Sequence, residues 1–326
     1  MTVAQSLESA FSICGKVIRV EASEAALFDA ACRFLSGFHF GEGAPDAADV
    51  VLHVDRDPPR SPLQGTTFSL PHGTAHHSPE QLRLEVCGSV VCTHSAKPSV
   101  VRVSFAEETR TRPGSMINVF SYAMQLVLRR LLLFDLHAAV VVSPAGTGVV
   151  IVGGSGAGKS TLTLNLIASG WRYLTDDMVV LDAARAPVAA QALRRLFALR
   201  RNEVAHLIDE TSAAWGTPVL SDPTKNRLDA FSLFGDRFVP EIAPRRLLFP
   251  HLAAGASRLE PLGSDAAMVE LLKASPWAVY DETTAGAHVR CLAALAAQCD
   301  SYRLVAGPDL LEPGAAAAFL EAKVAA

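Results

Sequence analysis

The sequence predicts an α/β protein in which a larger domain follows a smaller α+β domain. Three observations support this fold class. Short β-branched runs separated by turn-forming residues fill the first 113 positions. A glycine-rich segment at 153–160 lies between a strand-like run and an apolar helical pattern. Helical and strand patterns alternate over the rest of the chain, which is typical of α/β architecture.

The composition indicates a globular protein. A length of 326 residues suggests about two domains. Half of the residues are hydrophobic and 19% are charged, which supplies a core and disfavours disorder. A net charge of −4 argues against a sequence-independent nucleic-acid binder. No apolar stretch approaches the roughly 18–20 residues of a membrane span. The start lacks a signal-peptide pattern and the six cysteines include no Cys-x-x-Cys pair, so we expect a cytoplasmic protein with reduced thiols.

The smaller domain is predicted to occupy residues 1–113 and to be mostly antiparallel. The pair His76-His77 falls in a turn-like segment without metal-ligand spacing, so we expect it in a surface loop. The pair Pro113-Gly114 marks the expected domain boundary. A helix is expected at 23–36, and strands are expected at 16–20, 50–54, 82–87 and 100–105.

The larger domain, 114–326, is predicted to begin with a helix over 116–134. Two apolar runs follow, and a Pro-Ala-Gly-Thr-Gly turn between them predicts a hairpin of strands 138–142 and 148–152. Further helices are expected at 264–274, 284–298 and 314–324, with a strand at 302–305.

The segment Gly153-Gly-Ser-Gly-Ala-Gly-Lys-Ser160 fits the P-loop pattern G-x-x-x-x-G-K-[ST]. Its glycines allow backbone N–H groups to face a phosphate, and the dipole of the following helix adds to the attraction. The Lys159 ammonium should reach the β/γ-phosphates, and the Ser160 hydroxyl should bind Mg²⁺. We therefore predict ATP, or another nucleoside triphosphate, bound with Mg²⁺. The predicted nucleotide-binding residues are Gly153, Gly154, Ser155, Gly156, Ala157, Gly158, Lys159, Ser160 and Thr161.

Two carboxylate positions compete for the site beside this loop. A helix over about 159–169 carries the chain roughly 16 Å away from the phosphate. A strand at 171–175 then returns it by roughly 16 Å, which places Asp176-Asp177 at the phosphate edge. The run 178–181 would descend as the antiparallel partner of that strand and leave Asp182 at the far edge. We favour the Asp176-Asp177 pair, and Asp182, the placement of an ordinary NTPase, is the alternative.

Three segments resemble the HPr kinase/phosphorylase family and its relatives, which include kinases of ribosomally made peptides. They are Leu136-His-Ala-Ala-Val140, the glycine-rich loop, and Gly170-Trp-Arg-Tyr-Leu-Thr-Asp-Asp177. The resemblance covers about 130–185 and implies a P-loop kinase domain of the phosphoenolpyruvate-carboxykinase-like type. It also implies a homo-oligomer, because relatives often form rings or dimers.

The resemblance assigns roles to individual residues. His137 corresponds to the active-site histidine, and Asp177 to the acid/base aspartate. Asp176 is its close neighbour and is expected, with Ser160, to hold the metal, although the roles of the two aspartates could be exchanged. A catalytic arginine is expected downstream, where Arg227 is the first choice and Arg237 the second.

The chain also departs from the family pattern. Where the family has a metal-binding glutamate after the Asp pair, this chain has Leu193-Arg-Arg-Leu-Phe197. The family's Pro-Val-x-x-Gly-Arg-Asn signature is missing as well. These departures indicate a divergent relative with another substrate.

Taken together, these features predict a kinase that phosphorylates a Ser or Thr hydroxyl of a peptide or protein. A ribosomally made peptide is the most specific candidate, with the N-terminal domain gripping a leader segment by strand addition. The alternatives are a kinase of a small hydroxylated metabolite and a non-catalytic nucleotide-dependent switch. The tandem aspartate favours a kinase, because a nucleotide binder needs one metal carboxylate and no base.

Overall fold

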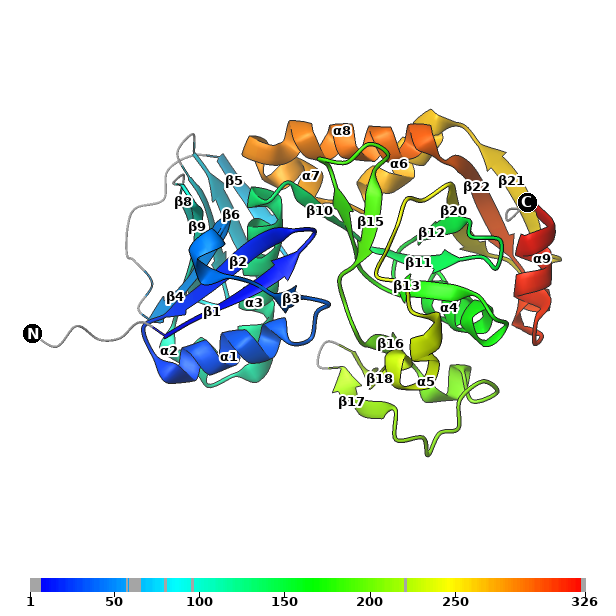
Figure 1. The fold of residues 1–326 in the computed structure, drawn as a ribbon, viewed down its shortest axis with the longest axis horizontal. Helices are drawn as coiled ribbons and strands as arrows, with labels where there is room; N and C mark the ends of the chain where they lie inside the picture. The colour runs from blue at the N-terminus through cyan, green and yellow to red at the C-terminus, as the bar shows by residue number, and fades with distance from the viewer. Residues whose placement is uncertain are drawn as a thin grey trace, which may run out of the picture. The chain divides into compact units, whose positions relative to one another are not determined.

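The computed structural model of this protein describes residues 7–56, 58, 66–78, 81–94, 97–219 and 222–323. The chain divides into two compact units, and most of their helices and strands are labelled in Figure 1. The first unit comprises Met1–Leu133 together with Val279–Gly286. The second comprises Phe134–Ala278 together with Ala287–Ala326. Apart from Pro58, the turn-forming run Asp57-Pro-Pro-Arg-Ser-Pro62 lies outside the described residues.

The first unit is built on a nine-stranded sheet with the strand order β3-β1-β2-β4-β9-β8-β7-β6-β5. The pairs β2–β4 and β4–β9 are parallel, and the other neighbours are antiparallel, as the sequence predicted for most of this unit. Its strands are β1 (Leu7–Ile13), β2 (Lys16–Ala22), β3 (Gly41–Glu42), β4 (Val50–Arg56), β5 (Thr66–Leu70), β6 (Gly73–His77), β7 (Leu82–Val86), β8 (Ser89–His94) and β9 (Ser99–Phe105).

The expectation for His76-His77 is wrong. Both residues belong to strand β6 and are 9% exposed, so they lie in the sheet and not in a surface loop. His77 Nδ1 lies 3.3 Å from a carboxylate oxygen of Glu282. A polar pair between Gly73 and Pro79 resembles a turn in sequence, but its pairing with β5 and β7 makes it part of a strand.

The long helix α3 (Pro113–Arg130) belongs to the first unit. The Phe120 ring lies 5.4 Å from the ring of Phe34 in helix α1 (Ala25–Leu35) and 5.0 Å from that of Phe105 in β9. The boundary of the first unit therefore falls after residue 133, beyond the expected position at 113. Pro113 marks a helix start, because proline is favoured at the first helical position. The helix ends at Arg130, earlier than expected, and Leu132 follows in a left-handed conformation with φ 57°. The remaining short helices of this unit are η1 (Pro45–Ala47) and α2 (Glu107–Arg110).

The second unit contains a six-stranded sheet in the order β13-β11-β12-β20-β22-β21. The predicted hairpin is confirmed, with Val140 paired to Val150 in antiparallel register. Strand β13 is antiparallel to β11, while β20 is parallel to β12 and β22 is parallel to β20. The carboxyl ends of β13, β12, β20 and β22 therefore meet at one edge of the sheet. The strands are β11 (Ala138–Val142), β12 (Gly148–Val152), β13 (Arg172–Thr175), β20 (Arg246–Leu252), β21 (Arg258–Leu262) and β22 (Asp300–Ala306).

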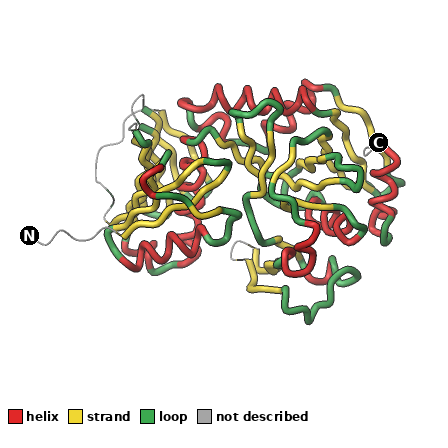
Figure 2. Tube along the Cα trace, viewed as in Figure 1, coloured by secondary structure: helices red, strands yellow, loops and turns green. Residues whose placement is uncertain are grey.

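Both faces of this sheet are covered, as fully apolar strands require. Alternate residues of β11 and β12 enter two separate cores. One core holds Leu164 of α4 (Lys159–Ala168) and Leu320 of α9 (Ala315–Lys323). The other holds Leu271 of α6 (Ser264–Lys273) and Leu292 of α8 (Glu282–Gln298). Figure 2 shows these helices outside the strands. The predicted helices near 264–274, 284–298 and 314–324 and the strand at 302–305 are thereby confirmed over the described residues.

Strands β13 and β14 do not pair, so the predicted antiparallel partnership of 171–175 and 178–181 is wrong. Strand β14 belongs to a separate four-stranded sheet, in the order β10-β14-β15-β19. Its Val179 and Leu181 enter the core that contains α6 and α8, whereas Tyr173 of β13 enters the opposite core. This sheet contains β10 (Leu133–Leu136), β14 (Val179–Asp182), β15 (Ala189–Ala192) and β19 (Glu241–Ile242).

A three-stranded sheet in the order β16-β18-β17 completes the second unit. Its strands are β16 (Phe197–Leu199), β17 (Trp215–Val219) and β18 (Asp222–Leu228). The remaining helices are η2 (Arg201–Glu203), α5 (Ala230–Phe234), η3 (Gly235–Arg237), α7 (Trp277–Tyr280) and η4 (Pro308–Leu311). Within the described ranges, the helices are all too short or too polar to cross a membrane.

Candidate active site

The glycine-rich loop connects β12 to α4 at the carboxyl edge of the six-stranded sheet. Gly156 and Gly158 both have φ 83°, a left-handed conformation in which a side chain would be strained. Helix α4 begins at Lys159, and no side chain of the described residues caps its N-terminus. The first N–H groups of a helix have no partner within the helix, so they are available to an anion. The geometry of the loop is therefore compatible with phosphate binding.

Lys159 is folded against its own loop. The side chain is buried, and Nζ donates hydrogen bonds to the carbonyl oxygens of Gly153 at 2.7 Å and Gly154 at 3.3 Å. Burial lowers the pKa of Lys159, whereas the negative charges of Asp177 and Asp176 oppose the shift. The loop carbonyls therefore hold the ammonium, and it remains within electrostatic reach of the two carboxylates.

Asp176 lies in the turn after β13 and is 1% exposed. Burial and the adjacent charge of Asp177 raise the pKa of Asp176 to about 7, although the Ser160 hydroxyl and the Ala198 backbone act against the shift. Neither carboxylate oxygen has a hydrogen-bond partner of good geometry among the described residues. Buried carboxylates without partners are costly, so a cation is the natural ligand of this position.

The pair Asp176 and Ser160 fits a magnesium site. Mg²⁺ prefers oxygen ligands and usually binds one or two carboxylates together with phosphate oxygens and water. No cluster of three or more His, Cys, Asp or Glu side chains occurs in the described part of the chain. A metal held here would therefore share its coordination with a bound phosphate.

Asp177 has a different set of neighbours from Asp176. Its Oδ1 lies 3.4 Å from Nδ1 of His137, the residue between β10 and β11, and its Oδ2 lies 3.8 Å from Nε of Arg194. Burial lowers the pKa of His137, while the charge of Asp177 opposes this shift. The carboxylate is 27% exposed and can therefore meet a molecule from solution.

A cavity of about 1050 Å³ brings these groups together. Its wall includes His137, both aspartates and the loop from Ser155 to Thr161, so the predicted site residues of this region share one space. Gly153 and Gly154 are not in the wall and contact Lys159 through their carbonyl oxygens. The other lining residues are Leu162, Asn165, Ala198, Leu199, Arg200, Glu203, Lys225, Pro250, Leu252, Ala253, Ala254, Ala306, Gly307, Pro308, Leu310 and Leu311.

The competing carboxylate and the two arginine candidates lie outside this wall as far as the chain is described. Asp182 ends β14 in the other sheet and accepts a hydrogen bond from the Ala184 amide at 2.9 Å. Arg227 pairs with Ala198 across β16 and β18. The Arg237 guanidinium donates a hydrogen bond to the Ile167 carbonyl at the end of α4 and lies 5.7 Å from the Phe234 ring. Arg237 therefore has a structural contact of its own.

Two other basic residues belong to the cavity wall, unlike the two arginine candidates. Lys225 and Arg200 line the cavity, and Lys225 lies near enough to lower the pKa of both His137 and Lys159. Lys225 is two residues before Arg227 on the same strand. A strand pattern indicates which residues share a face, but only the sheet's position decides which of them reaches the cavity.

Comparison with known proteins finds a family match for part of this chain. Residues 133–200 match the family model of the HPr Serine kinase C-terminal domain. Over this segment the chain is a relative of the HPr kinases. The matched segment contains His137, the glycine-rich loop, the Asp pair and Arg194, and the matched family is one of serine kinases.

One structural neighbour is the Hpr(Ser) kinase/phosphatase from Coxiella burnetii. It is 19% identical to this chain, and the match covers 39% of this chain and 72% of that one, with a TM-score of 0.25. No curated protein matches the chain.

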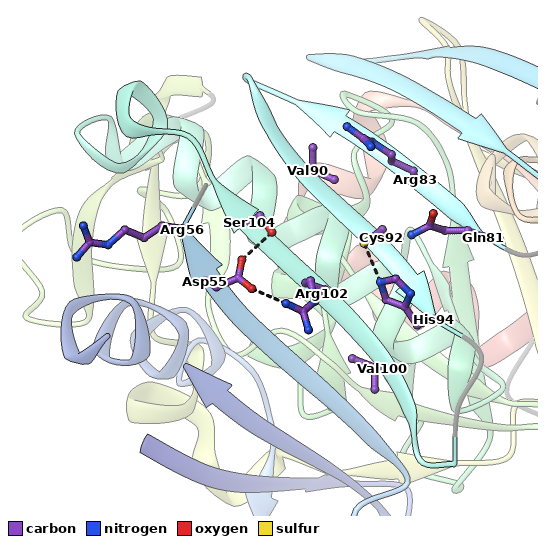
Figure 3. A pocket seen from close by; sticks show the side chains of 10 residues that line it. All are labelled: Asp55, Arg56, Gln81, Arg83, Val90, Cys92, His94, Val100, Arg102 and Ser104. Atoms are coloured by element: carbon purple, nitrogen blue, oxygen red, sulfur yellow. Dashed lines mark hydrogen bonds and ion pairs between the residues drawn. The ribbon is translucent and has the colours of Figure 1, made fainter. Parts of the chain in front are cut away.

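A second cavity, of about 600 Å³, lies on the sheet of the first unit (Figure 3). Its charged groups compensate one another, because Arg102 and Ser104 both donate to the Asp55 carboxylate at 2.7 Å. Cys92 Sγ lies 3.3 Å from His94 Nε2, and burial raises the pKa of that thiol. A protonated thiol is a poor nucleophile. The charged groups of this partly exposed cavity thus have partners within it, and we assign the cavity no ligand.

Proposed function

We propose that this protein is an ATP- and Mg²⁺-dependent kinase that transfers the γ-phosphoryl group to a Ser or Thr hydroxyl of a peptide or protein. The observation that carries the proposal is the division of the Asp pair. Asp176 is buried beside Ser160, while Asp177 is paired with His137 and remains accessible. Both aspartates line the same cavity as the phosphate loop.

In this proposal the metal ion and the acceptor hydroxyl interact with different carboxylates. Asp176 and Ser160 hold Mg²⁺, which supplies charge neutralisation of the phosphates when it is bound. Asp177 orients the acceptor hydroxyl and accepts its proton as the hydroxyl oxygen attacks the γ-phosphorus. The bond from that phosphorus to the β–γ bridging oxygen breaks, and ADP leaves. His137, whose pKa is lowered by burial, orients the Asp177 carboxylate.

Three cations would stabilise the transferring phosphoryl group in this arrangement. Lys159 follows the loop, and Lys225 lines the same cavity. Arg194, 3.8 Å from Asp177, occurs in the segment that replaces the family's glutamate motif. Preorganised positive charge is the main source of rate in phosphoryl transfer. We assign to Lys225 and Arg194 the role that the sequence suggested for Arg227.

The peptide acceptor is supported by the relationship to serine kinases over 133–200. Capture of a leader segment by the first unit would use an unpaired sheet edge, and β3 and β5 are the edge strands of its sheet. A small metabolite as acceptor would bind in the cavity alone and would not need a sheet edge. Assembly into a homo-oligomer remains part of the same proposal.

The proposal is tested by incubating the full-length protein with γ-labelled ATP, Mg²⁺ and a mixture of Ser- and Thr-containing peptides, followed by mass spectrometry. We expect phosphate on hydroxyl side chains of a subset of peptides, and none with Lys159→Ala. Transfer that survives Lys159→Ala would refute the phosphate site. Binding of ATP without transfer to any hydroxyl would favour a nucleotide-dependent switch.

A further inference from the structure

The phosphate loop separates two different regions of the sheet edge. The strand order β13-β11-β12-β20-β22 places the Asp pair, which follows β13, on one side of the loop. The ends of β20 and β22 lie on the other side of it. Neighbouring strands are about 4.8 Å apart, so β13 and β22 each lie about 10 Å from the loop strand β12, and β20 lies about 5 Å from it on the side of β22. A phosphate chain whose γ end faces Asp177 therefore directs its opposite end toward β20 and β22.

This opposite side of the cavity is apolar. Leu252 at the end of β20 is 60% exposed, and Leu311 at the end of η4 is 56% exposed, although both line the cavity. The Leu252 side chain reaches the loop, since its Cδ2 would lie 3.5 Å from a Cβ placed on Gly158. Large apolar side chains exposed beside a cavity indicate a place where an apolar surface binds.

The two segments that carry these leucines are fixed to each other. The Ala253 amide donates to the Ala306 carbonyl at 2.9 Å. Ser257 Oγ donates to Asp309 at 2.7 Å and accepts from the Gly307 amide at 2.8 Å. The side-chain polar groups of Ser257 and Asp309 are thus engaged with each other. The apolar side is preformed and does not need to be ordered by its ligand.

We propose that Leu252 and Leu311 clamp the nucleobase of the phosphoryl donor, and that the clamp accepts adenine and guanine equally. This proposal rests on the proposed function for the position of the phosphates. The lining residues on this side within the described ranges are Pro250, Leu252, Ala253, Ala254, Ala306, Gly307, Pro308, Leu310 and Leu311. None of these has a side-chain hydrogen-bonding group. A site discriminates strongly between similar molecules only where its polar groups would be left unpaired by the wrong one. Here that discrimination would rest on backbone groups alone, and the Ala253 amide and the Ala306 carbonyl already bond each other.

The clamp is tested by titration calorimetry of the full chain with MgATP, MgGTP and magnesium tripolyphosphate, which has phosphates but no base. The variants are Leu252→Ser and Leu311→Ser, with Val269→Ser as control, because Val269 of α6 is 51% exposed and outside the cavity wall. For the wild type we expect the two nucleotides to bind within about threefold of each other and at least about tenfold tighter than tripolyphosphate. Each leucine variant should lose about fivefold to tenfold for both nucleotides and nothing for tripolyphosphate. The control should match the wild type.

Three results would overturn the clamp: a preference of more than about tenfold for one purine, leucine variants with wild-type nucleotide affinity, or an equal loss for tripolyphosphate. The first two leave the proposed function intact, provided that Lys159→Ala abolishes binding of all three ligands. A wild type that binds none of the three overturns the clamp and the proposed function together.

Discussion

At the scale of residues, two adjacent aspartates have different surroundings because the chain turns sharply between β13 and β14. Asp176 points into the interior beside Ser160, and Asp177 reaches His137 and Arg194. The sequence predicts that this pair returns to the loop, because the lengths of the helix and the strand set the distance. It does not separate the two roles, which depend on residues far along the chain.

The identity of the cations near the Asp pair also depends on contacts between segments that are distant in sequence. The sequence suggests Arg227 as the catalytic cation, but the residue of this strand that lines the cavity is Lys225. The choice depends on the register of β18 against β16, where Ala198 pairs with Arg227. Pairing between strands this far apart in sequence has no local signal.

We predict that the buried carboxylate of Asp281 stabilises the first unit. Its buried carboxylate accepts hydrogen bonds from Arg129 Nε at 3.1 Å, Arg130 at 2.8 Å and Thr284 Oγ1 at 2.8 Å. Burial acts to raise the pKa of Asp281, but Arg130, Thr284 and Arg129 outweigh it, so the pKa lies below its usual value. The stabilisation is therefore fully present above the unfolded pKa of about 3.9 and is lost as the pH falls through the lower folded pKa.

We expect Asp281→Asn to lower the free energy of unfolding by about 3–5 kcal/mol at pH 7, because it leaves two arginines without their buried partner. The difference from the wild type should shrink at pH values below about 4. Urea denaturation at several pH values measures both effects. Glu8→Gln, at an exposed position of β1, is the control and should change stability by less than about 0.5 kcal/mol. A pH-independent loss, or no loss at pH 7, would contradict the assignment.

At the scale of elements, the segment from β12 to β13 folds as its sequence indicates. Helix α4 ends where expected, since Gly170 has φ 99° and the Trp171 amide donates to the Leu166 carbonyl at 3.0 Å. The next strand, β14, was predicted in the wrong sheet. Its fully apolar run Val179-Val-Leu181 is compatible with either sheet, and only the two opposed cores decide between them.

Gly156 supports a prediction about this loop. A Cβ at Gly156 would meet no atom within 4 Å, so Gly156→Ala adds only backbone strain, about 1–2 kcal/mol at φ 83°. Gly146, in the turn between β11 and β12, has φ 90° and equally open space, so Gly146→Ala is a matched control outside the phosphate site. Both variants should lose similar thermal stability.

Only Gly156→Ala should lose nucleotide affinity, by about tenfold, because relief of the strain moves loop amides away from the phosphates. Titration with MgATP measures the affinity, and thermal unfolding measures the stability. Equal MgATP affinities for the two alanine variants would show that this loop does not hold the phosphates.

At the scale of the whole molecule, the candidate site lies entirely in the second unit. The α/β class and the succession of two units could be predicted from composition and periodicity. The membership of α3 and of Val279–Gly286 in the first unit could not, because it depends on contacts such as Arg129 with Asp281, 152 residues apart. The match to the serine kinase family over 133–200 covers the part of the second unit that carries the loop and the Asp pair.

The central claim is that Asp177 serves as the base for an acceptor hydroxyl beside the Lys159 loop. The direct test uses a peptide that the mass-spectrometric screen identifies as a substrate, in its unphosphorylated form. Single-turnover transfer from labelled MgATP to this peptide is measured for the wild type, Asp177→Asn and Asp182→Asn. We predict that Asp177→Asn slows transfer by about 10²- to 10⁴-fold while MgATP affinity stays within about threefold, and that Asp182→Asn transfers at the wild-type rate. Wild-type transfer by Asp177→Asn, or loss confined to Asp182→Asn, would contradict the account.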